Sequence, residues 1–156
     1  MDLIDRIPAP VLAHSLLWEA LVDIAEMRPL GIGPLGERRI VPILGGEFRG
    51  GPGHEWLRGT VLPGGADRQL VRRDGAKELD ALYEMEVLDG TVLTIRNRVI
   101  VDETVPGPRY ALSRIEVSAP DGPWSWLGRR LIVGTLQSAR PGRAAVLIRA
   151  WLMETT

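Results

Sequence analysis

Between residues 77 and 101 the chain reads KELDALYEMEVLDGTVLTIRNRVIV. Apolar and polar residues alternate on both sides of Asp89-Gly90, and one face of the first run carries Leu79, Ala81, Tyr83, Met85 and Val87. Such alternation is typical of strands with one face in a core and the other in water. Asp-Gly between two alternating runs is the strongest short-range signal for a hairpin. The segment therefore predicts two antiparallel strands whose apolar faces point into one core.

The same pattern extends over most of the chain. Gly, Pro or Asp-Gly separates further short apolar runs, at residues 38–44, 57–62, 66–73, 108–118, 124–138 and 144–154. The last run opposes Val146, Ile148, Ala150 and Leu152 to Arg149 and Trp151. We expect about eight to ten strands without helical crossovers, in an all-β fold: a single antiparallel, closed or nearly closed β-barrel, calycin/lipocalin-like in general architecture. Closure removes the exposed edges that an open sheet would present.

The N-terminal quarter is less regular. Residues 16–27 fit an amphipathic helix through Leu17, Leu21 and Ile24, but they also fit an alternating strand, which the strands downstream favour. Residues 29–36, rich in Gly and Pro, predict a long loop. Residues 1–15, which contain Pro8 and Pro10, predict a loose arm or a single helical turn. We expect one domain over residues 1–156.

Composition excludes several functional classes. The chain has no cysteine, which removes disulfides and thiolate metal sites, and its two histidines, His14 and His54, lie forty positions apart. We therefore expect no metal and no cofactor. A net charge of −1 gives no basic face for nucleic acid. The longest uncharged apolar run, residues 131–136, is far shorter than a membrane span, and residues 1–15 do not read as a secretory signal. We expect a cytoplasmic protein that binds a small molecule, and we leave open whether it forms a homodimer.

A family resemblance rests on several short motifs. These are the segment Leu62-Pro63-Gly64-Gly65-Ala66-Asp67, then Leu79-Asp80-Ala81 with Tyr83, Arg96-Asn97-Arg98, and Trp124 and Trp126 before Val133-Gly134. Together they resemble the domain of unknown function 3237, also called uncharacterised protein family 0311, over residues 17–154. The resemblance implies a small β-barrel. It implies no activity, because most members have none assigned.

The candidate site residues are polar groups on faces expected to point inward. Asn97 interrupts an apolar strand face, and a buried amide costs about 1–3 kcal/mol unless it is paired. Asp67 follows two glycines, so it either caps a tight turn or stands at the barrel mouth as a general base. Glu116 is the second candidate base if the face that it shares with Arg114 points inward.

Four further residues are candidates for substrate binding. Tyr83 brings a hydroxyl to an apolar face, and Arg38 is a cation suited to stabilising negative charge. Trp124 and Trp126 share a strand face, where they either stack on a planar ligand or pack in the core.

Two functions fit these residues. The first is a cofactor-independent isomerase, cyclase or lyase acting on an apolar or aromatic, polyketide-like metabolite, with a carboxylate as the general base. The alternative is a non-catalytic, lipocalin-like carrier of a hydrophobic small molecule, which needs the same cavity and no catalytic carboxylate. The two differ in whether a carboxylate points into the cavity beside a hydrogen-bond donor.

Overall fold

The alternating segments form ten antiparallel strands in one sheet, in a computed structural model that describes all of residues 1–156. The strands are β1 (Leu12–Ile24), β2 (Arg28–Gly33), β3 (Gly36–Gly50), β4 (Gly59–Val61), β5 (Ala66–Arg72), β6 (Lys77–Val87), β7 (Val92–Asp102), β8 (Tyr110–Ser118), β9 (Ile132–Ser138) and β10 (Ala145–Thr155). Two short helices complete the chain, α1 (Leu3–Arg6) and the 3-10 helix η1 (Ser125–Arg129).

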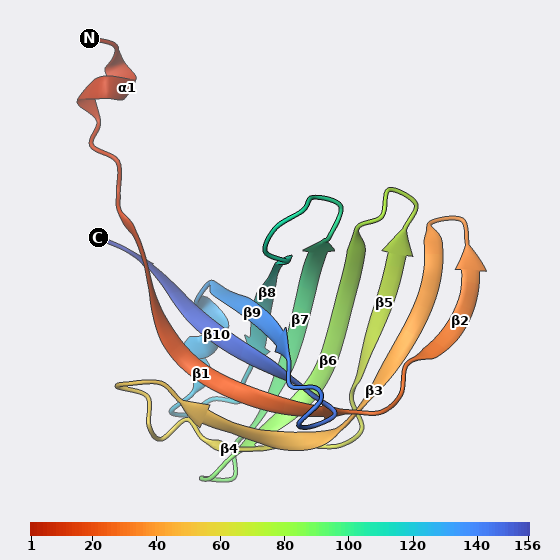
Figure 1. Cartoon of the computed structure of the whole chain (residues 1–156). Helices are drawn as coiled ribbons and strands as arrows, with labels where there is room; N and C mark the ends of the chain where they lie inside the picture. The colour runs from red at the N-terminus through yellow and green to blue at the C-terminus, as the bar shows by residue number, and fades with distance from the viewer.

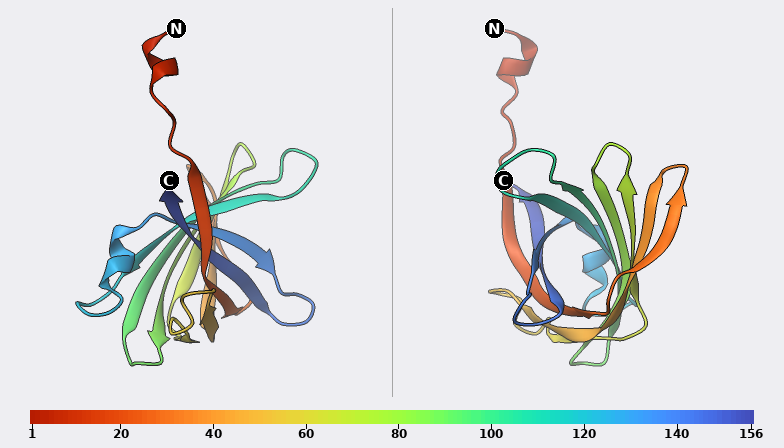
Figure 2. Two further views of the ribbon diagram at one scale, coloured as in Figure 1. Left: turned by 90° about the vertical axis from the view of Figure 1, so that its left-hand side faces the viewer. Right: turned by 45° about the vertical axis from the view of Figure 1, so that its right-hand side comes forward.

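The sheet closes on itself. Neighbouring strands run from β1 through β10, β9, β8, β7 and β6 to β5 and β3, and β3 pairs with β1 again. The result is a closed eight-stranded antiparallel barrel with β2 and β4 as extra strands, and its ring is seen end-on in Figure 2 (right). The prediction of an all-β barrel is confirmed.

The hairpin predicted at Asp89-Gly90 is present with the expected faces. β6 pairs with β7 so that Ala81 lies opposite Asn97, Tyr83 opposite Ile95 and Met85 opposite Leu93. All six side chains are buried, whereas Glu78, Glu86 and Arg96 on the other faces are exposed. The period of two therefore fixes which side chains reach the barrel interior.

Two local predictions differ from the structure, and a third is confirmed. The Gly- and Pro-rich residues 29–36 are mostly strand, because β2 pairs with the start of β3 in a short hairpin. The run 124–138 is strand only from Ile132 onward, and η1 precedes it. Residues 16–27 are strand up to Ile24, as the alternation favoured.

The N-terminal arm is shorter than predicted. β1 begins at Leu12, where it already pairs with the end of β10. The preceding residues, with the single turn of α1, extend away from the barrel (Figure 1). No helix in the chain combines the length and the apolar composition that a membrane crossing requires.

The barrel interior has two unlike ends. Near η1 it is filled by fully buried side chains, including Met85, Leu93, Ile95 and Leu127. Toward the other end, past Ala81 and Asn97, the interior is hollow.

Candidate functional site

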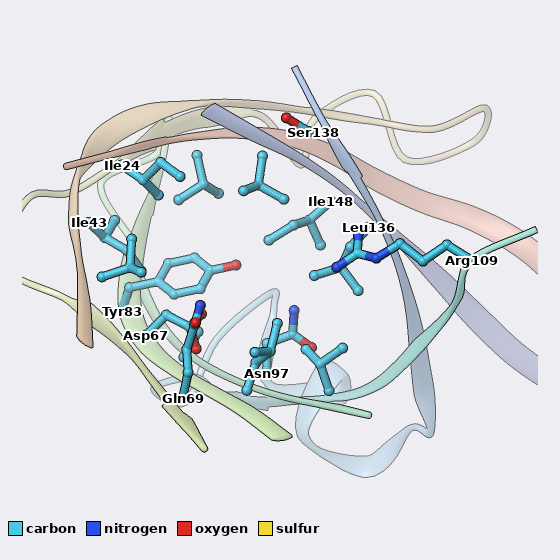
Figure 3. A pocket seen from close by; sticks show the side chains of 16 residues that line it. Ile24, Ile43, Asp67, Gln69, Tyr83, Asn97, Arg109, Leu136, Ser138 and Ile148 are labelled. Carbon is cyan, nitrogen blue, oxygen red and sulfur yellow. The ribbon is translucent and has the colours of Figure 1, made fainter. Parts of the chain in front are cut away.

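The hollow end of the barrel is a cavity of about 210 Å³. Its walls are mostly aliphatic and come from strands far apart in sequence, with Val22, Ile24, Val41, Ile43, Leu136 and Ile148 among them (Figure 3). An engineered apolar cavity of about 150 Å³ holds a benzene ring, so this space accommodates a small ring compound. Six polar side chains interrupt the aliphatic wall: Asp67, Gln69, Tyr83, Asn97, Arg109 and Ser138.

One row of paired residues forms the polar part of the wall. Asp67 of β5 lies opposite Ala81 of β6, and Ala81 lies opposite Asn97 of β7. Neighbouring strands are about 4.8 Å apart, so the Cα atoms of Asp67 and Asn97 are separated by roughly 10 Å. Because Ala81 has only a methyl group, the space between the two polar side chains stays open.

The Gly64-Gly65 pair explains how Asp67 reaches this row. Gly64 has a φ of +108°, which side chains other than glycine rarely adopt. A Cβ atom on Gly65 would lie 2.5 Å from Cβ of Tyr83, so only glycine lets the turn pack against β6 here. The backbone of Ile43 holds the turn by donating to the Gly65 carbonyl at 2.9 Å. β5 therefore starts close to β6 with Asp67 facing inward.

Asp67 does not cap this turn. Its Oδ2 accepts a hydrogen bond of 2.8 Å from Nε2 of Gln69, and its Oδ1 is buried without a hydrogen-bond partner. Desolvation raises the pKa of this carboxyl above its ordinary value, and the bond from Gln69 and the backbone of Asp80 only partly oppose the rise. Asp67 is therefore a carboxylate with one free oxygen in an apolar cavity.

Two unpaired donors lie near that carboxylate. The hydroxyl of Tyr83 and both amide atoms of Asn97 are buried without partners, and each side chain is only 1% exposed. Burial, and then the negative charge of Asp67, raise the pKa of Tyr83 above its ordinary value, so its hydroxyl stays protonated and able to donate. Buried polar groups are nearly always hydrogen-bonded, so unpaired ones gathered around one cavity indicate a place where a ligand supplies the missing bonds.

The chemistry available is proton transfer beside a polarised oxygen. A desolvated carboxylate accepts a proton near neutral pH more readily than an exposed one, and neutral donors opposite it stabilise developing negative charge. Figure 3 shows the side chains of Asp67, Tyr83 and Asn97 bordering the same space. No group of three or more His, Asp or Glu side chains is arranged to hold a metal ion.

Two predicted site residues lie outside the barrel. Glu116 is a candidate base only if its face of β8 points inward, but the buried residues of β8 are its neighbours Ile115 and Val117. Glu116 instead pairs with Arg98 at 3.8 Å on the outer surface. Arg38 is exposed on the outer face of β3, because the inward positions of that strand are those of Val41 and Ile43. Neither side chain lines the cavity, and the condition that made Glu116 a candidate base is not met.

The two predicted tryptophans lie elsewhere on the barrel. Trp124 and Trp126 belong to the η1 segment and pack against the filled end of the core. Nε1 of Trp124 donates to Asp89 at 2.9 Å, and the Trp126 ring stacks on His54 with centroids 6.1 Å apart. Neither lines the cavity, so the interpretation of these tryptophans as ligand-stacking residues is wrong and core packing is the alternative that the structure bears out.

Sequence reasoning missed three lining residues. Gln69 follows Asp67 by two residues on β5, and this spacing indicates that both side chains face the same side of the strand. Ser138 ends β9, and Arg109 lies in the loop before β8, where no strand period applies. Both side chains are exposed at the rim of the cavity.

Comparison with known proteins identifies relatives of the whole barrel. A family model described as protein of unknown function DUF3237 matches residues 12–153. A protein of Rhodopseudomonas palustris strain TIE-1 described as a UPF0311 protein is 31% identical in an alignment of length 143, and the match covers 81% of this chain and 88% of that protein.

Solved structures agree with the fold. The crystal structure of a conserved protein of unknown function from Rhodopseudomonas palustris has a TM-score of 0.79 at 30% identity and covers 94% of this chain and 100% of its own. A β-barrel-like protein from Acinetobacter baumannii also has a TM-score of 0.79, at 26% identity, with 94% and 99% covered. A structure described as an enzyme from Penicillium herquei has a TM-score of 0.71 at 18% identity, with 95% and 98% covered, a likeness of fold alone.

Proposed function

For this chain, which belongs to the DUF3237 family of proteins of unknown function, we propose the function of a cofactor-independent isomerase, cyclase or lyase acting on a small apolar or aromatic metabolite. In this proposal Asp67 is the general base. Tyr83 and Asn97 bind the oxygen on which negative charge develops. The reaction begins with removal of a proton next to a carbonyl group.

The observation that carries the proposal is the free Oδ1 of Asp67, buried without a partner beside the unpaired donors of Tyr83 and Asn97. A carrier of apolar molecules needs shape alone, and an unpaired buried carboxylate makes such a cavity less favourable. An enzyme gains from the same group, because a base with a raised pKa transfers protons efficiently near neutral pH.

The proposed step conserves atoms and charge. Oδ1 of Asp67 takes a proton from the carbon, the C–H electron pair forms a C=C bond, and the carbonyl π pair moves onto oxygen. The Tyr83 hydroxyl and the Asn97 amide donate to that oxygen. Return of the proton to another carbon completes an isomerisation. Attack of the enolate carbon on a second carbonyl group of the same molecule, whose oxygen takes the proton from Asp67, completes a cyclisation. Departure of a β-substituent with its bonding electron pair completes an elimination.

A fold-level analogy supports catalysis in a barrel of this shape, since the structural neighbour from Penicillium herquei is described as an enzyme. The analogy concerns architecture and carries no reaction type to this chain.

Proton exchange in heavy water tests the proposal. A panel of small enolisable ketones with one or two rings is incubated with the protein, and replacement of C–H by C–D is followed by NMR. We expect exchange of at least one compound with the wild type and a loss of about 10²- to 10⁴-fold with Asp67→Asn, the range typical for removal of a general base.

The matched control is Glu116→Gln, the same loss of a carboxylate on the outer surface, which should leave exchange unchanged. If Asp67→Asn catalysed the exchange at the same rate as the wild type, the proposed role of this carboxylate as the base would be overturned. Binding of compounds without any exchange would identify the protein as a carrier instead.

A further inference from the structure

Arg109 gives the cavity a charge opposite to that of Asp67. It comes from the loop between β7 and β8 and is the single cation among the lining residues, as Asp67 is the single acid. Figure 3 shows its side chain reaching toward the cavity beside Leu136, across from Asp67, with Asn97 between the two.

The guanidinium of Arg109 is largely uncommitted. Its only ion-pair contact is from Nε to Oε1 of Glu103 at 3.9 Å, close to the limit for such a pair. The same oxygen of Glu103 also lies 3.4 Å from Nζ of Lys77, so one carboxylate is shared by two cations. The terminal nitrogens of Arg109 have no hydrogen-bond acceptor in the protein, which leaves a planar pair of donors free at the rim.

A planar pair of N–H donors fits the two oxygens of a carboxylate, in the bidentate geometry that arginine provides and lysine does not. A ligand carboxylate is repelled by Asp67 and attracted by Arg109, so the two charges orient a ligand within the cavity. The remainder of the ligand then lies against the aliphatic wall, with its far side at Asp67, Tyr83 and Asn97.

From this arrangement we propose that the ligand is a small ring acid: a compound of one or two rings whose carboxylate binds Arg109 at the rim and whose neutral polar group reaches Tyr83 and Asn97. The size follows from the cavity volume of about 210 Å³, which exceeds the roughly 150 Å³ that holds a single benzene ring. The ring acid would be the substrate of the proposed proton-transfer site. Only this identification of the ligand as the substrate rests on the proposed function.

A matched pair of probes tests the charge preference. Calorimetry compares 2-naphthoate with 2-naphthamide, which have the same rings and differ in the negative charge. We expect the wild type to bind the acid about tenfold more tightly than the amide, a modest factor because Arg109 is partly solvated. Arg109→Gln should weaken binding of the acid about tenfold and leave the amide unchanged.

Two further variants locate the effect. Arg129→Gln removes the same charge from an exposed side chain at the η1 end and should change neither affinity. Ala81→Leu fills the space between Asp67 and Asn97, so it should weaken both probes. Thermal melts establish that each variant is folded before binding is measured.

Several results would overturn the inference: equal affinity for acid and amide, no binding of either, the same loss in Arg129→Gln as in Arg109→Gln, or unaltered binding to Ala81→Leu. Asp67→Asn separates this inference from the proposed function. If the variant binds naphthoate at least as tightly as the wild type but no ketone exchange depends on Asp67, the ring-acid site stands and the catalytic proposal fails. If exchange depends on Asp67 but acid and amide bind equally, the reverse holds.

Discussion

β6 and β7 line both ends of the barrel, and the two halves of this one hairpin behave differently. Near the turn, Met85 and Leu93 are opposite each other and fully buried in the packed core. Four residues further along β6, the pair is Ala81 and Asn97, which borders an open cavity with unpaired polar atoms.

The difference lies in what covers each half. Next to the Met85–Leu93 pair, the η1 segment contributes Leu127, which is 1% exposed and completes the packing. At the Ala81–Asn97 pair, no helix enters the barrel, and the small side chain of Ala81 leaves space between Asp67 and Asn97. One strand pattern therefore builds a stable core at one end and a ligand-sized space at the other, and stability and function can be altered separately.

The largest stability effect should come from the filled end. Leu127→Ala removes a fully buried side chain from close packing, and we expect the free energy of unfolding to fall by about 2–5 kcal/mol. The matched change at the cavity, Leu79→Ala, should cost less than about 2 kcal/mol, because Leu79 is half-buried and borders space that is already open. Urea unfolding of both variants measures the difference. Equal losses would mean that the two ends are packed alike.

A change of opposite sign is expected at the cavity. Asn97→Leu removes two buried amide atoms that have no partners and leaves no protein group newly unpaired. We expect the free energy of unfolding to rise by about 1–3 kcal/mol, a gain of roughly 2–4 °C in Tm per kcal/mol for a chain of this size.

The control for Asn97→Leu is the reverse kind of substitution, from an apolar side chain to an amide, two residues away on β7. Ile95→Asn buries an amide in the filled half, where it should destabilise the protein strongly. If Asn97→Leu lowered the Tm instead, Asn97 would be a satisfied core amide, and the distinction between the two halves would fail.

The fold was predictable because its signals are local and repeated. Alternation in residues 79–87 and 93–101, with Asp89-Gly90 between them, determined both the hairpin and its inward face. That parity also selected Tyr83 and Asn97 as lining residues. In β8 the alternation did not determine which face points inward, since Tyr110 and Leu112 place apolar groups on the outer face, which also carries Glu116.

The remaining errors concern features without a strand period. Trp124 and Trp126 are two residues apart, a spacing that fits one face of a strand as well as a turn of 3-10 helix. Arg109 lies in a loop, so its place at the cavity depends on tertiary structure alone. Local patterns thus identified strand residues of the site and missed the cation at its rim.

The last prediction concerns the ionisation of Asp67, and it involves the smallest change in free energy. Desolvation raises the pKa of Asp67 in the folded protein, so exchange activity should rise with pH through a range above that of an ordinary Asp carboxyl and then level off. In Gln69→Leu the carboxylate loses its hydrogen-bond donor at 2.8 Å. Since that bond lowers the pKa of Asp67, its loss should move the midpoint of the pH profile higher while the plateau stays close to that of the wild type.

Stability measured against pH gives an independent test of the same ionisation. The folded protein holds the Asp67 proton to higher pH than the unfolded chain does, so the stability linked to this proton is complete below the unfolded pKa and is lost as pH rises through the folded pKa. Asp67→Asn has no such proton, and it should gain in Tm relative to the wild type across that window. The carboxylates of Glu19, Asp23 and Glu47 have lowered pKa values because arginines bind them, and they act in the opposite sense, but they are common to both proteins and cancel in the difference. A difference in Tm that stays constant with pH would mean that Asp67 ionises as an exposed carboxyl does, and the hollow end would then lack the desolvated base that separates it from the filled one.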